Sequence, residues 1–153
     1  MALIIKSKGF NNGGLISSNF TCDGQDISPE LEWENVPAST KSLALIMDDP
    51  DAPRGTWDHW ILFNIPAMVT KLESNIKQLP EGTKVGKNSW GRNDYGGPCP
   101  PDREHRYFFK LYALDTMLNL ESGVTKQAIE QEIAEHVIEY AEIICRYNRI
   151  SNK

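Results

Sequence analysis

The segment from Gly96 to Asp115 constrains the fold of this chain most, because a loop rich in glycine and proline passes without a linker into a strand-like run. Residues 96–101 read Gly-Gly-Pro-Cys-Pro-Pro, and residues 106–115 are predominantly apolar and aromatic. Glycine tolerates positive φ and close backbone approach, whereas proline fixes φ and lacks an N–H. We expect this loop to form one wall of a small-molecule pocket, with residues 48–59 forming the other.

Several earlier segments also have the pattern of β-strands. Their residues either alternate between polar and apolar or form short apolar runs bounded by proline and turn residues. The run at 42–48 is uniformly apolar, which indicates a central strand covered on both faces. The expected strands before residue 96 are 3–5, 30–34, 42–48, 57–65 and a short one at 85–86.

The last third of the chain has a different pattern. From Thr125, a suitable N-cap, apolar residues recur every three or four positions, at Ile129, Ile133, Val137, Ala141 and Ile144. This spacing predicts one amphipathic helix or two abutting ones. With strands first and a helix last, the sequence predicts a single domain over residues 1–153. Its expected class is mainly β, an antiparallel β-sandwich or Greek-key sheet with a C-terminal helix packed on it.

Charge and cysteine content limit the classes of function. A net charge of -5 argues against a general nucleic-acid or anionic-membrane binder, and no apolar run approaches a membrane span or a signal peptide. Three cysteines at irregular spacing indicate neither a disulfide framework nor a zinc site, so we expect a reduced, cytoplasmic protein. A disulfide between Cys22 and Cys99 stays open as an alternative, because both lie in glycine- or proline-rich loops.

Two histidines stand at comparable places, each at the start of a long strand after a loop. We expect His59 and His105 to share a pocket with Asp49, Asp51 and Tyr107, which lie at similar strand ends. Imidazoles and a tyrosine hydroxyl are hydrogen-bond donors that suit a phosphate or carboxylate, and a carboxylate in the same pocket is expected to face a histidine.

Other residues have less specific expected roles. The Gly-Gly-Pro turn would present the amide of Gly97 to a ligand, and Trp57 and Trp90 suit the rim of the pocket. His136 is expected to lie within the C-terminal helix without a ligand role. Cys99 is a weak candidate nucleophile, because flanking prolines do not lower the pKa of a thiol.

Three classes of function are compatible with this pocket. The favoured one is a non-enzymatic protein that binds a small anion without cofactor or metal. The first alternative is a metal-assisted or acid–base hydrolase using Asp49, His59 and His105, although the sequence has no HExxH or similarly tight ligand spacing. The second alternative is a protein-interaction scaffold whose pocket is idle.

The two pocket segments resemble those of the phosphatidylethanolamine-binding protein family, also called Raf kinase inhibitor-like proteins. The first motif is Asp49-Pro50-Asp51-Ala52-Pro53 followed by His59, and the second is Gly97-Pro98 followed by His105-Arg106-Tyr107. Residues 21–24, 28–33 and 136–142 are similar to the bacterial and archaeal branch. The resemblance implies a β-sandwich with a small pocket at one end that accepts phosphate, phosphorylethanolamine or similar anions.

The resemblance also implies particular roles and partners. By position, the pocket would be lined by Asp49, His59, Gly97, Pro98, His105 and Tyr107. Asp51 would brace the loop, with Trp57 and Arg106 in supporting positions. Family members are associated with inhibition of kinases or proteases, and prokaryotic members are often homodimers. Compact bacterial members end without the longer C-terminal extension of eukaryotic relatives, which supplies a further pocket residue and partner contacts, and we expect the same of this chain.

Overall fold

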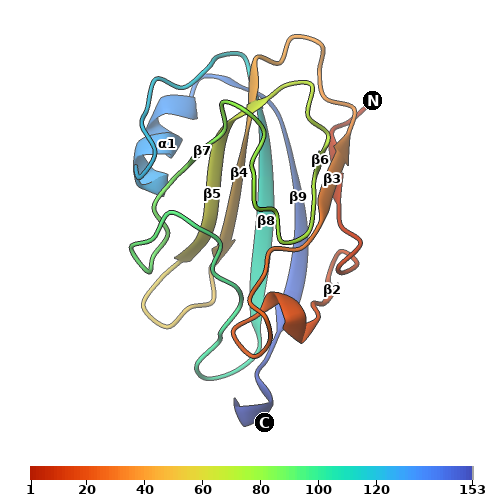
Figure 1. Cartoon of the computed structure of the whole chain (residues 1–153), viewed down its shortest axis with the longest axis vertical. Coiled ribbons are helices and arrows are strands. Elements are labelled where there is room, and N and C mark those ends of the chain that lie inside the picture. Colours follow the sequence, from red (N-terminus) through yellow and green to blue (C-terminus); the bar gives the residue numbers. More distant parts are fainter. Residues whose placement is uncertain (153) are drawn as a thin grey trace.

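Two β-sheets packed face to face form the body of the molecule in the computed structural model, which describes residues 1–152 (Figure 1). The smaller sheet has the strand order β1-β3-β6, and the larger has the order β2-β9-β8-β4-β5-β7. The strands are β1 (Ile4–Lys6), β2 (Gly14–Leu15), β3 (Leu31–Glu34), β4 (Ser42–Asp49), β5 (Trp57–Pro66), β6 (Lys71–Leu72), β7 (Lys84–Val85), β8 (His105–Leu114) and β9 (Val137–Tyr147). The helices are α1 (Lys126–Ile133) and two 3-10 turns, Ser18–Phe20 and Ile150–Asn152.

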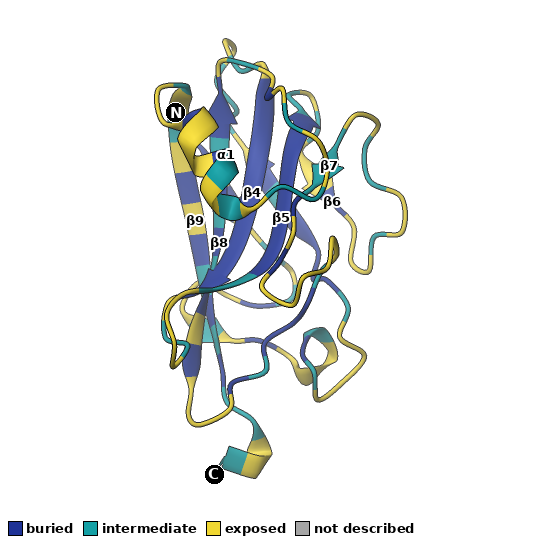
Figure 2. Ribbon diagram, turned by 90° about the vertical axis from the view of Figure 1, so that its left-hand side faces the viewer, coloured by how far each residue is buried: buried dark blue, intermediate teal, exposed yellow. Residues whose placement is uncertain are grey.

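The main hydrophobic core lies between the two sheets, and a second, smaller core lies under α1. The main core includes Trp33 of β3, which faces apolar residues of β4, β5, β8 and β9. On the other face of the large sheet, Ile129 and Ile133 of α1 pack against β4 and β5 (Figure 2). Because β4 is covered from both sides, all eight of its residues are buried.

This architecture confirms the expected β-sandwich and most of the expected strands. All pairings in the two sheets are antiparallel except that of β2 with β9, which is parallel. The strands expected at 3–5, 30–34, 42–48, 57–65, 85–86 and 106–115 correspond to β1, β3, β4, β5, β7 and β8, with small shifts at their ends. No helix within residues 1–152 is long and apolar enough to cross a membrane.

The prediction for the last third of the chain was partly wrong. The helix does begin after Thr125, whose side chain accepts a hydrogen bond from the amide of Ala128, but it ends at Ile133. Residues 137–147 instead form β9, which pairs along the whole of β8. From Ala141 to Tyr147 every second residue is buried, so the period is two. Apolar residues at 137, 141 and 144 also fit a helical spacing, and the β-branched content of this segment was the better signal.

The revised boundary also moves His136. The residue lies in the turn between α1 and β9 rather than within a helix, and its Nδ1 is 2.8 Å from an Asp115 carboxylate oxygen. This position is at the far end of β8 from His105. His136 therefore belongs to the connection that returns the chain to the sheet.

The C-terminal end of β4 and the N-terminal ends of β5 and β8 meet at one end of the large sheet. Asp49 pairs with Trp57 across β4 and β5, and Asp48 pairs with Phe108 across β4 and β8. The pairing of β4 with β5 shifts register here and leaves His59 as an extra residue in β5. Such a bulge re-aims side chains, so His59 and Trp60 do not face opposite ways as regular alternation would require.

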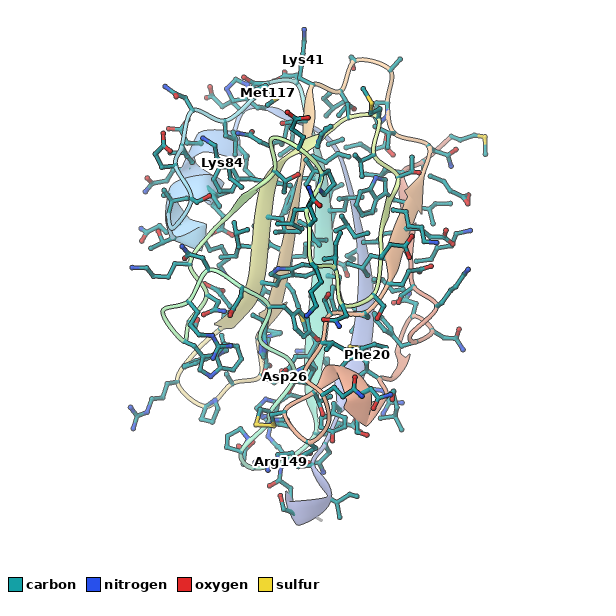
Figure 3. All side chains as sticks on the ribbon, viewed as in Figure 1. Phe20, Asp26, Lys41, Lys84, Met117 and Arg149 are labelled. Carbon is teal, nitrogen blue, oxygen red and sulfur yellow. A yellow bond between two sulfur atoms is a disulfide. The ribbon has the colours of Figure 1, made fainter. Side chains whose placement is uncertain are left out.

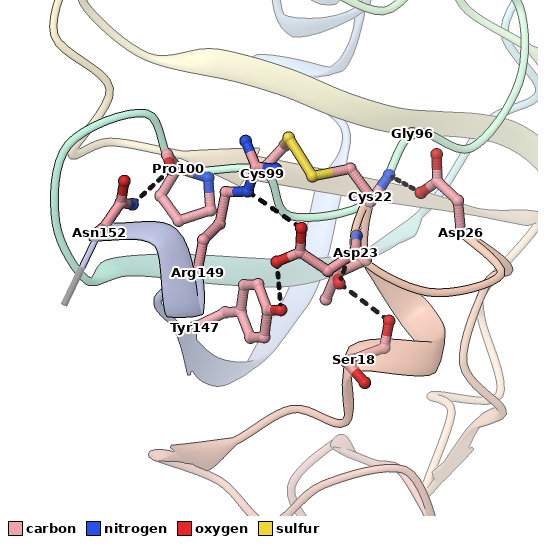
Figure 4. The surroundings of a disulfide bond; sticks show 12 residues. Ser18, Cys22, Asp23, Asp26, Gly96, Cys99, Pro100, Tyr147, Arg149 and Asn152 are labelled. Carbon is pink, nitrogen blue, oxygen red and sulfur yellow. Dashed lines mark hydrogen bonds and ion pairs between the residues drawn. A yellow bond between two sulfur atoms is a disulfide. The ribbon is translucent and has the colours of Figure 1, made fainter.

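A disulfide between Cys22 and Cys99 joins two loops at this same end of the molecule (Figure 3). The two cysteines are 77 residues apart in the sequence. Around the bond, the amide of Cys22 donates to the Pro98 carbonyl, and Asp23 accepts hydrogen bonds from Tyr147 and Arg149 (Figure 4). The disulfide therefore fastens the loop before β8 to the N-terminal part of the chain.

The expectation that the cysteines form no disulfide was wrong for this pair, and the alternative that the sequence left open is the one observed. Pairing depends on how close two loops lie in space, which irregular spacing along the chain does not report. The remaining cysteine, Cys145, is buried in β9. The odd cysteine count therefore no longer supports a reducing compartment.

The length of chain closed by the disulfide gives a first prediction. Replacing both cysteines by alanine should lower the free energy of unfolding by about 4 kcal/mol, because the unfolded chain gains entropy when the loop opens. For a chain of this size the melting temperature should fall by roughly 10 °C in a calorimetric scan. A reductant should lower the melting temperature of the wild type and leave that of the double variant unchanged. Equal melting temperatures for oxidised wild type and variant would contradict this account.

Candidate functional site

A pocket of about 320 Å³ opens at the end of the large sheet where β4, β5 and β8 meet. Three segments build it: the end of β4 with the following loop, the start of β5, and the proline-rich loop before β8. Its lining is mostly apolar and aromatic, with a few polar groups. The lining residues are Asp49, Ala52, Pro53, Arg54, Trp57, His59, Trp90, Cys99, Pro101 and His105.

A buried hydrogen bond between Asp49 and His105 ties β4 to β8. The Oδ2 atom of Asp49 is 2.7 Å from Nδ1 of His105, and the two residues are only 3% and 1% exposed. Asp49 Oδ1 also accepts the amide of Asp51. Burial raises the pKa of the Asp49 carboxyl, and the hydrogen bond from His105 opposes part of that rise.

The second nitrogen of His105 also faces a carboxylate. Its Nε2 atom is 2.8 Å from Oδ1 of Asp102, which lies three residues earlier in the proline-rich loop. This contact lowers the pKa of the Asp102 carboxyl. Ionised carboxylates only accept hydrogen bonds, so both nitrogens of His105 can donate only when the ring is an imidazolium.

His59 is held in its neutral form. Its Nδ1 is 2.8 Å from the carbonyl oxygen of Gly96, and because a carbonyl only accepts, this nitrogen carries the proton. Burial lowers the pKa of the imidazole to about 4. Near neutral pH, Nε2 of His59 is therefore an acceptor, which differs from the expectation that both histidines would be donors to the ligand.

Two buried donors near the pocket have no hydrogen-bond partner within residues 1–152: the Tyr107 hydroxyl and the Trp57 Nε1–H. Trp57 lies in the pocket lining. Tyr107, which the sequence placed in the lining, is not among the lining residues but packs against both histidines, with ring centroids 5.3 Å from His59 and 6.4 Å from His105. Burial also raises the pKa of the Tyr107 hydroxyl far above its usual range, so it keeps its proton. An unpaired buried donor costs about 1–3 kcal/mol.

Aromatic rings form one side of the pocket. The ring of Trp90 makes edge-to-face contacts with Trp57 and His59, at centroid distances of 5.5 and 5.0 Å. Gly96 permits this packing, because a Cβ atom at that position would lie 2.2 Å from the Trp90 ring. Both tryptophans thus lie at the pocket, where the sequence placed them.

Asp51 and Arg106 brace the site from outside. The Arg106 guanidinium makes two hydrogen bonds of 2.9 Å to the Asp51 carboxylate, and the Arg106 amide makes a third of 3.0 Å. These contacts lower the pKa of the Asp51 carboxyl to about 2. The pair fixes the loop after β4 to the start of β8, which leaves Asp51 with its charge balanced.

Gly97 and Pro98, which the sequence placed in the pocket, are not among its lining residues. The amide of Gly97 donates to Oδ1 of Asp26 at 2.7 Å, so it is not presented to a ligand as the sequence suggested. A Cβ atom on Gly97 would lie 2.2 Å from the Phe20 carbonyl oxygen, which explains the glycine. The role of this turn is to let the two disulfide-linked loops pack closely.

Sequence reasoning brought Asp49, His59 and His105 to one place but missed Asp102, Arg54 and Pro101. Asp102 is the most consequential of these, because it contacts a pocket histidine directly. In the sequence, only its position three residues before His105, in the loop expected to form one wall of the pocket, pointed to Asp102. Within residues 1–152, no group of three or more histidine, cysteine, aspartate or glutamate side chains is arranged to hold a metal ion.

A β-sandwich with a small, partly polar pocket at the end of its central strands has the architecture of a ligand-binding protein. The comparisons with known proteins specify the family. Residues 6–148 match the sequence profile described as phosphatidylethanolamine-binding protein. The chain therefore belongs to the phosphatidylethanolamine-binding protein family, as the motifs around His59 and His105 indicated.

Relatives and solved structures agree with this assignment. A UPF0098 protein of Methanothermobacter thermautotrophicus is 50% identical over 148 residues, which is 95% of this chain and 98% of that one. One from Aquifex aeolicus is 46% identical, covering 94% and 86%. The crystal structure of a phosphatidylethanolamine-binding protein homolog from Chlamydia trachomatis superposes with a TM-score of 0.92 at 38% identity, covering 97% and 98%. Escherichia coli YbcL, described as a member of the mammalian family, gives 0.91 at 32%, covering 97% and 99%.

The neutral state of His59 gives a second prediction, on stability against pH. The pKa of this imidazole is about 4 in the folded protein against about 6.5 in an unfolded chain, so acid favours the unfolded state, which binds the proton first. The stability that the folded protein gains from keeping His59 neutral is complete above pH 6.5 and is lost as the pH falls toward 4. Urea unfolding should show that wild type loses about 3 kcal/mol more between pH 7 and pH 4 than His59→Asn, which lacks the titrating group. Parallel losses in the two proteins would show that His59 titrates normally.

Proposed function

We propose that this protein is a non-enzymatic binding protein whose pocket takes a small anion bearing a phosphate or a similar oxygen-rich group. The observation that carries the proposal is the pair of unpartnered buried donors, the Trp57 Nε1–H and the Tyr107 hydroxyl. A ligand with several acceptor oxygens would satisfy both and recover part of the free energy that their burial costs.

The charges around the pocket are compatible with an anion of low charge. Asp49 is bonded to His105, and Asp51 is balanced by Arg106, so neither carboxylate is left unpaired toward a ligand. Arg54 lies in the lining and adds a positive charge. The neutral Nε2 of His59 is an acceptor and favours a ligand that keeps one hydroxyl, such as a monoprotonated phosphate.

The alternative function for the same residues is that of a hydrolase, which requires a catalytic geometry as well as binding. Acid–base hydrolysis needs a residue positioned to move a proton to or from the reacting group. The Asp49–His105 hydrogen bond resembles the orienting half of such a system, but Nε2 of His105 is engaged by Asp102. Turnover of a phosphoester by the purified protein would favour the hydrolase over the binding protein.

The Tyr107 hydroxyl gives the third prediction. In Tyr107→Phe the free energy of unfolding should not fall, because the hydroxyl has no partner in the protein, whereas affinity for inorganic phosphate or phosphorylethanolamine should fall about tenfold. Calorimetric titration measures the affinity, and urea unfolding measures the stability. Tyr112→Phe is the matched control, because Tyr112 lies on the opposite face of β8, beside Tyr140. Unchanged affinity in Tyr107→Phe would remove this hydroxyl from the ligand site.

A further inference from the structure

The Asp102–His105 contact stands out because it occupies a pocket histidine with a group from the protein itself. His105 has one nitrogen fixed by the buried Asp49, so Nε2 is the only donor of this ring that an incoming ligand can use. The Asp102 carboxylate holds that donor at 2.8 Å. A carboxylate oxygen and a phosphate oxygen are the same kind of acceptor for an imidazole N–H.

We propose that Asp102 is an internal competitor of the ligand: its carboxylate takes the position on His105 Nε2 that an anionic oxygen of the ligand would take, and it must leave when the ligand binds. The proposal rests on the proposed anion-binding function and adds its regulation by a residue of the pocket loop.

Burial differs sharply between the two ends of this contact. The His105 side chain is fully buried, whereas that of Asp102 is 48% exposed. Within residues 1–152, His105 is the only side chain that makes a hydrogen bond or ion pair with Asp102. The histidine is therefore fixed, and the carboxylate can turn into solvent while the rest of the loop keeps its contacts. The disulfide at Cys99 and the hydrogen bond from Asn152 to the Pro100 carbonyl hold the start of that loop.

Electrostatics point the same way. With Asp102 in place, the His105 ring lies between two carboxylates, and a second carboxylate at this position disfavours a nearby anion. When Asp102 leaves, one of these two carboxylates is removed and Nε2 of His105 is free to contact an anionic oxygen. Removing the Asp102 carboxylate should therefore strengthen anion binding, which is the opposite of what loss of a ligand-binding residue would do.

The size of the effect follows from how often Asp102 occupies the histidine. The apparent dissociation constant equals the intrinsic one divided by the fraction of molecules in which the site is free. If Asp102 is bound in about nine molecules of ten, Asp102→Ala should bind inorganic phosphate about tenfold more tightly than wild type.

Calorimetric titration of inorganic phosphate into wild type, Asp102→Ala and Glu104→Ala tests the proposal. Glu104→Ala is the matched control, because it removes one negative charge from the same loop. The Glu104 carboxylate pairs with Arg146 and not with His105. We expect a gain of about tenfold for Asp102→Ala and less than twofold for Glu104→Ala. Asp102→Asn, which keeps the shape and loses the charge, should show an intermediate gain.

The outcomes separate this inference from the proposed function. Wild type that binds phosphate while Asp102→Ala binds equally or more weakly would overturn the competition and leave anion binding intact. An equal gain in Glu104→Ala would attribute the effect to net charge and also overturn it. Absence of phosphate binding in all the proteins would overturn both proposals. If Asp102→Ala binds phosphate and wild type does not, both proposals are supported. Asp102 would then block the site almost completely in the wild type.

Discussion

The hydrogen bond between Asp49 and His105 is the interaction on which the candidate site depends. It joins the end of β4 to the start of β8 inside the protein, where neither group can exchange its partner for water. Removing one member of a buried charged pair typically costs 3–5 kcal/mol, because the other is left without a partner. The bond occupies Nδ1 of His105, so Nε2 is the ring nitrogen that is left for Asp102 or for a ligand.

Other contacts hold this pair in place, and they join segments that are far apart in the sequence. Arg106 and Asp51 fix the loop after β4 to β8, and the disulfide fixes the loop before β8 to the N-terminal third of the chain. The close approach of the loops requires glycine at position 97. The second core under α1 supports the opposite face of the same strands. The pocket thus lies at a cross-linked end of the sheet, and the exposed side chain of Asp102 contacts one of its lining residues, His105.

Much of this arrangement could be predicted from the sequence. Period-two and apolar runs identified the strands, because a strand with one buried face, or a central strand with two, leaves a direct trace in residue order. The antiparallel order of β4, β5 and β8 then brings Asp49, His59 and His105 to the same end of the sheet. The β9 segment was mistaken for helix because residues 137, 141 and 144 have a helical spacing, whereas the residues that are buried in the structure, 141, 143, 145 and 147, alternate as in a strand paired with β8.

Other features depend on contacts that residue order does not contain. The bulge at His59 is a property of how β4 and β5 pair, and the neutral state of that histidine comes from the Gly96 carbonyl and from burial. The amide of Gly97 turned to Asp26 because the disulfide-linked loops lie against each other. Asp102 was visible in the sequence as one more charged loop residue. Its contact with His105 became apparent only in three dimensions.

The central claim is that His105 presents a single donor to an anion at this end of the sheet, and a crystal structure of the protein grown with saturating inorganic phosphate tests it most directly. The account predicts phosphate in the pocket beside Trp57, within hydrogen-bond distance of Nε2 of His105, with the Asp102 carboxylate turned away. A pocket without phosphate, or phosphate bound there while Asp102 still contacts His105, would contradict it.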